Sequence, residues 1–82
     1  MDLLENALSK AKGALGSARV IKGYSVVKKL QSRGFTLEEI ADDFNVDLSE
    51  LKGFVSICDR LSAGEQVFSL DALSSTIVAK LA

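Results

Sequence analysis

The apolar residues of this chain recur at intervals of three and four, and no stretch alternates between apolar and polar residues as a strand would. Over residues 2–15, for example, the spacing is set by Leu4, Leu8, Ala11 and Leu15. The 82 residues include no proline, so glycines and capping residues must mark where each helix begins and ends. The sequence therefore predicts an all-α fold.

Glycines mark the ends of the first two expected helices. Gly13 and Gly16 interrupt the apolar stripe of residues 2–15, so this helix should end or bend near Gly16. A second amphipathic stretch covers residues 18–33, and Gly34 follows it at the left-handed position that commonly ends a helix.

Capping signals mark the starts of three further helices. Thr36 and Glu39 have the spacing of a capping box, in which each side chain accepts a hydrogen bond from the other residue's backbone amide. Asp47 starts a similar pattern, and Ser69, preceded by Phe68, comes before the last apolar stripe. We expect one domain, residues 1–82, with about five short helices over residues 2–15, 18–33, 37–44, 48–61 and 70–81.

Two of these helices are joined by only three residues, and the residue types at this junction form a specific pattern. Ala41 is small where the helices would cross, and Asn45 tolerates a left-handed turn. Val46 and Leu51 follow as aliphatic residues that would be buried. In these features residues 36–54 resemble the helix-turn-helix family. The resemblance implies a central trihelical unit over about residues 18–61, flanked by the outer helices 2–15 and 70–81.

The resemblance also implies that helix 48–61 would enter a groove of double-stranded DNA. Its polar strip supplies the candidate groove contacts, which are Ser49, Lys52, Gly53 and Ser56. Basic residues of this helix and of helix 18–33 are candidate phosphate contacts, namely Arg19, Lys22, Lys28, Lys29, Arg33 and Arg60. Two observations argue the other way. Basic residues on a helix commonly form only a solvated face, and helix 48–61 starts with Asp47 and Glu50.

Charge divides the chain into two halves. Residues 1–34 carry seven basic and two acidic side chains, a net charge of +5, whereas residues 35–82 carry three basic and nine acidic ones, a net charge of −6. A basic half suits an anionic partner, and halves of opposite sign also allow head-to-tail contacts between copies of the chain.

The sequence therefore predicts a small helix-turn-helix DNA-binding protein without enzymatic activity, acting as a transcriptional regulator or a DNA-associated accessory factor. One alternative is a helical protein–protein interaction module that docks a partner on the acidic segment 38–50. Another is a self-assembling subunit that does not bind DNA. A homodimer through the outer helices would match two DNA half-sites, and a self-contained monomer is the alternative to it.

The residue inventory argues against other kinds of site. The chain has no His and a single Cys, so a His-based acid–base pair, a Cys/His zinc site and a disulfide framework all lack their parts. We therefore expect no catalytic residue, no metal and no cofactor. No apolar run is long enough for a membrane span, and the lone Cys58 and the absence of an apolar N-terminal signal fit a cytoplasmic protein.

Overall fold

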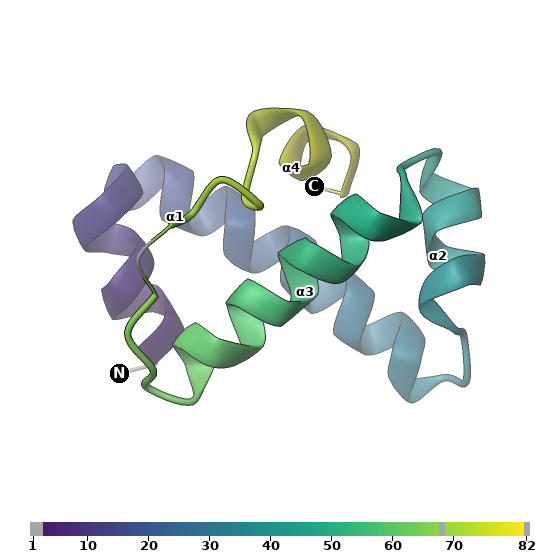
Figure 1. Ribbon diagram of the computed structural model, residues 1–82, viewed down its shortest axis with the longest axis horizontal. Coiled ribbons are helices and arrows are strands. Elements are labelled where there is room, and N and C mark those ends of the chain that lie inside the picture. Colours follow the sequence, from purple (N-terminus) through teal and green to yellow (C-terminus); the bar gives the residue numbers. More distant parts are fainter. Residues whose placement is uncertain (1–2, 68, 82) are drawn as a thin grey trace.

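The computed structural model describes residues 3–67 and 69–81, and these form four helices and no strand (Figure 1). The prediction of an all-α fold is confirmed, although about five helices were expected. None of the described helices is both long and apolar enough to cross a membrane. The helices are α1 (Leu3–Ser32), α2 (Leu37–Phe44), α3 (Leu48–Ser62) and α4 (Ser75–Leu81).

Residues 3–32 form one bent helix where two helices had been expected. The bend lies at Gly13, three residues earlier than predicted, and Gly16 stays helical. Gly13 has φ 76° and ψ 175°, a conformation that residues with a side chain rarely adopt. Because the bend turns the following residues, Leu15 is 72% exposed although it belongs to the expected apolar stripe, whereas Ser17 is buried.

Three helices end at a left-handed residue, namely Gly34 after α1, Asn45 after α2 and Gly64 after α3. In each case the amide of the next residue donates to a carbonyl five residues back, at 3.1 Å, 2.9 Å and 3.0 Å respectively. These are Schellman motifs, which satisfy carbonyls that a helix end would otherwise leave unpaired. The predictions for Gly34 and Asn45 are confirmed.

The last helix begins at Ser75, five residues later than expected. Ser69 was expected to start it but lies in an irregular segment, where its Oγ accepts a hydrogen bond from the amide two residues on (3.4 Å). Phe68, the expected apolar neighbour of Ser69, lies outside the described residues. Ser74 caps α4 instead, because its Oγ accepts from the amide three residues on (3.4 Å). Leu73 is buried, so packing holds the segment before α4.

The core lies where α1 packs against α3 and α4 (Figure 1). Gly23 lies close to both helices, since a Cβ added to it would lie 3.2 Å from Leu81 Cβ and 3.5 Å from Phe54 Cζ. Val26 and Ile57 are half-buried by this chain's own residues. The outer segments also contribute to the core, through Leu4, Leu8, Leu73, Ile77, Val78 and Leu81.

Candidate functional site

The candidate site is the α2–α3 hairpin, residues 36–62, and local hydrogen bonds define both of its helix starts. Thr36 Oγ1 accepts from the amide of Glu39 (3.2 Å), and Glu39 Oε1 accepts from the amide of Thr36 (3.0 Å). The predicted capping box is therefore confirmed. At the start of α3, Asp47 Oδ1 accepts from the amide of Ser49 (3.1 Å).

The inside of the hairpin has the features expected for a close helix crossing. Ala41 is 4% exposed, and Ile40 and Leu51 are fully buried. Asn45 has φ 55° and ψ 48° at the turn. Lys80 of α4 donates from its Nζ to the backbone oxygen of Asn45 (2.8 Å), so α4 is attached to the turn. No local pattern could have placed Lys80, because it is 35 residues away in the sequence.

The polar strip of α3, which supplies the candidate groove contacts, is less exposed to solvent than the sequence suggested. Ser49, Lys52 and Ser56 are exposed, as groove contacts would require. Gly53, in the middle of the strip, is half-buried, and a Cβ added to it would lie 3.5 Å from Ala72 Cβ. The segment that leads into α4 therefore covers part of the strip. Close approach to a nucleic acid at Gly53 would require this segment to move.

The six candidate phosphate contacts do not form one surface. Arg19, Lys22 and Lys29 are exposed on α1, and Arg33 is exposed in the turn that follows this helix. Lys28 lies on another side of α1, where its Nζ is 3.1 Å from Asp59 Oδ1. Arg60 Nε is 3.6 Å from Glu65 Oε1. In Figure 1 the C-terminal half of α1 lies behind α3.

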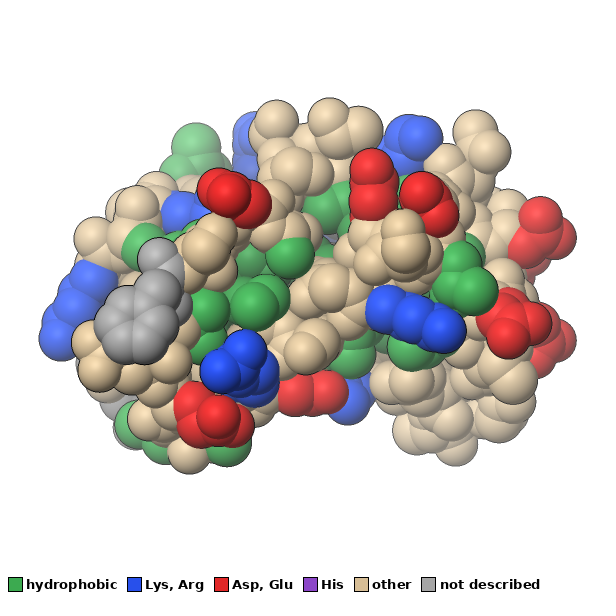
Figure 2. Space-filling view, in the orientation of Figure 1, with side chains coloured by type: hydrophobic (Ala, Val, Ile, Leu, Met, Phe, Trp, Pro, Cys, Tyr) green, Lys and Arg blue, Asp and Glu red, His purple; other side chains and the backbone are tan. Residues whose placement is uncertain are grey.

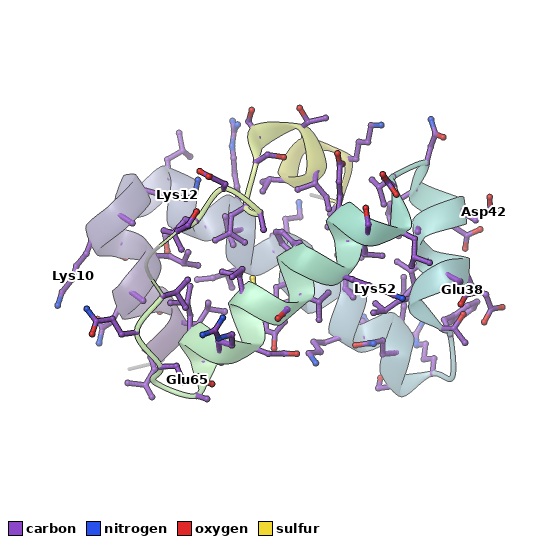
Figure 3. The ribbon with its side chains drawn as sticks, in the orientation of Figure 1. Lys10, Lys12, Glu38, Asp42, Lys52 and Glu65 are labelled. Atoms are coloured by element: carbon purple, nitrogen blue, oxygen red, sulfur yellow. The ribbon has the colours of Figure 1, made fainter. Side chains whose placement is uncertain are left out.

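Acidic side chains dominate the hairpin itself. Residues 37–62 contain two bases, Lys52 and Arg60, and seven acids. On the face shown in Figure 2, red and blue side chains are interspersed along α3, without a continuous basic surface. In Figure 3, Lys52 extends from α3 toward α2, which carries Glu38 and Asp42 on its outer side. The acids are Glu38, Glu39, Asp42, Asp43, Asp47, Glu50 and Asp59, all of them exposed.

A cluster that the sequence did not reveal connects α1 to α3. The Tyr24 hydroxyl donates to Asp59 Oδ1, and Lys28 Nζ, which pairs with the same carboxylate, lies 5.4 Å from the centre of the Tyr24 ring. Burial and the hydrogen bond to Asp59 raise the pKa of Tyr24 well above its usual value. Burial also raises the pKa of the neighbouring Cys58 thiol to about 12, so this cysteine is a protonated core residue at neutral pH.

No protein-family model, curated protein or solved structure matches this chain. The likeness to helix-turn-helix proteins therefore rests on the residues of the hairpin alone, above all on Ala41 and Asn45. The function of the chain has to be argued from the geometry and the charge of this hairpin.

Proposed function

We propose that this chain is a helical protein-interaction module, which docks a basic segment of a partner protein on its acidic α2–α3 hairpin. The observation that carries the proposal is the charge of the hairpin, a net −5 over residues 37–62, from seven acids and two bases. None of the four acids of α2 forms an ion pair within the described residues. Glu39 takes part in the capping box, and the other three acids are available to the cations of a partner.

An exposed aromatic ring beside these acids gives the surface an apolar contact. Phe35 immediately precedes the Thr36 cap and is 40% exposed. Aromatic residues are enriched at protein interfaces, where they contribute much of the binding energy, while surrounding charges steer the approach of the partner. Phe35, Glu38 and Asp42 together fit a Lys/Arg-rich segment that also carries an apolar side chain.

The negative charge of DNA makes a protein the better partner for the acidic surface of the α2–α3 hairpin. Duplex DNA carries about one negative charge per 1.7 Å of its axis, and binding proteins neutralise its phosphates with Lys and Arg. In a helix-turn-helix complex the first helix of the motif crosses the DNA backbone. Here that helix, α2, has four exposed acids and no base.

The test is the affinity of the full chain for a labelled Lys/Arg-rich peptide with one central Leu, measured by fluorescence anisotropy at several salt concentrations. We expect salt-sensitive binding that Glu38→Lys combined with Asp42→Lys weakens about tenfold or more. Glu5→Lys with Asp71→Lys makes the same change in net charge elsewhere on the surface, and should change the affinity far less. Equal losses in the two double variants would contradict docking on the hairpin, and so would absence of binding at about 50 mM salt.

DNA binding is the second candidate function, favoured by the buried Ala41 and the left-handed Asn45 of the hairpin. In this proposal α2 and α3 join residues 18–32 of α1 in a trihelical helix-turn-helix unit of a homodimeric regulator. Lys52 would enter the groove, and the bases of α1 would contact phosphates.

Titration of a labelled duplex at several salt concentrations decides between the two functions. Binding at about 50 mM salt that is weakened by Lys52→Ala, and by Lys29→Ala with Arg33→Ala, would support DNA binding and contradict the protein-docking proposal. Absence of duplex binding under these conditions would reject DNA binding.

A further inference from the structure

A second candidate site, separate from the hairpin, lies between α1 and α4. A cavity of about 290 Å³ opens there, lined by residues of both helices and by the segment that precedes α4. Pockets for small molecules commonly have volumes of about 300–1,000 Å³, so this cavity suits a ligand at the small end of that range.

The cavity has an apolar floor and a cationic rim. The floor contains Val20 and Leu73, each 1% exposed, and Val78, which is 6% exposed. Lys12 and Arg19 are exposed at the rim, and neither forms an ion pair or a side-chain hydrogen bond with another described residue. None of the described residues that line the cavity is acidic. Two positive charges therefore border an apolar space without a negative partner.

The bend of α1 contributes to this arrangement. Lys12 directly precedes Gly13, where the helix bends, and Gly16 and Arg19 follow it. A Cβ added to Gly16 would lie 3.0 Å from Lys12 Cβ, so the glycine leaves room for Lys12 to pack against the next turn. In Figure 3 Lys12 lies beside the segment that leads into α4, whereas Lys10 points outward at the far end of the molecule.

We propose that this cavity binds a small organic monoanion with an apolar body, of the class of medium-chain carboxylates. The carboxylate binds Lys12 and Arg19 at the rim, where a charge-assisted hydrogen bond is stronger than a neutral one. The alkyl chain lies on Val20, Leu73 and Val78, which removes its apolar surface from water. The site shares no residue with the acidic surface of the hairpin, so its existence does not depend on the proposed function.

The first test is a titration of the isotope-labelled full chain with hexanoate, followed by amide chemical shifts. We expect saturable changes in the amide chemical shifts of Gly16, Val20 and Val78, with a Kd of about 1 mM for so small a ligand. Hexanol has the same apolar body without the charge and should bind about tenfold more weakly. Equal affinities for the two ligands, shifts that map elsewhere, or absence of saturable binding would overturn the proposal.

Variants separate the contributions of the rim and the floor. Lys12→Gln with Arg19→Gln should weaken hexanoate about tenfold and leave hexanol unchanged, whereas Lys10→Gln, a nearby exposed lysine outside the cavity, should change neither. Ala79 lines the cavity and is exposed, so Ala79→Phe should fill the space and abolish binding without unfolding the chain. Thr76→Phe, at an exposed position of α4 outside the cavity, is its control. Binding that survives Ala79→Phe would contradict the location of the site.

Discussion

The helix boundaries of the α2–α3 hairpin and the placement of the chain's two ends depend mainly on different kinds of interaction. Each boundary in the hairpin has its own local hydrogen bonds, from Thr36, Asn45 and Asp47. The C-terminal helix α4 has seven residues, too few to be stable alone, and it depends on side chains buried against the rest of the molecule. Removing a core contact at an end should therefore cost more than removing a cap in the hairpin.

The largest expected effect is at the C-terminal end of the core. Leu81 is 2% exposed and packs beside Gly23, so Leu81→Ala should lower the free energy of unfolding by about 2–5 kcal/mol. Leu15→Ala is the control, because Leu15 is 72% exposed and its loss should stay within about 0.5 kcal/mol. Urea denaturation followed by circular dichroism measures both. Similar losses in the two variants would show that α4 is not part of the cooperative core.

The next effect is in the hairpin and concerns packing. Ala41 is 4% exposed where α2 meets α3, so two extra methyl groups in Ala41→Val should destabilise the fold by about 1–3 kcal/mol through overpacking. Ala18→Val makes the same change at an exposed position of α1, where only helix propensity acts, at a cost below about 1 kcal/mol. If the two variants are equally stable in urea, α2 and α3 do not cross closely at Ala41.

The boundaries that could be predicted from the sequence are those determined by neighbouring residues. The capping box and the Asn45 turn each involve side chains and amides within five residues, and the range predicted for α2 agrees with the structure. The bend at Gly13 and the late start of α4 are not determined in this way. Two glycines could have supplied the bend, and Ser69 and Ser74 could each have capped α4, so residue types alone did not decide between them.

The candidate surface was less predictable than the fold for the same reason. The sequence identified polar and basic residues by helical spacing, and Ser49, Lys52 and Ser56 are exposed as expected. It could not show that the segment around Ala72 covers Gly53, or that Lys28 pairs with Asp59, because these contacts join residues far apart in the chain. The electrostatics of a surface depend on such long-range contacts.

A smaller effect compares two helix caps. Thr36 both accepts and donates in a reciprocal capping box, at 3.2 Å and 3.0 Å, so Thr36→Ala should cost about 1 kcal/mol. Ser74 makes a single longer hydrogen bond of 3.4 Å at the start of α4, so Ser74→Ala should cost about 0.5 kcal/mol. Urea midpoints at constant m-value give both numbers. A larger loss for Ser74→Ala would mean that α4 depends on its cap as much as on its packing.

The smallest effect is expected at the hairpin turn, where the backbone conformation is unusual and the side chain contributes little. Asn45 has φ 55°, which glycine adopts without strain, so Asn45→Gly should leave the free energy of unfolding within about 0.5 kcal/mol. The contact with Lys80 survives this change, because Lys80 donates to the backbone oxygen of residue 45. Asn45→Ala keeps that oxygen but pays the steric cost of a left-handed residue with a Cβ, about 1–2 kcal/mol. Glycine should therefore be the better replacement, although it is the more flexible residue in the unfolded chain. If alanine proves the more stable of the two, the turn relaxes to a right-handed conformation and α2 and α3 no longer meet as a tight hairpin.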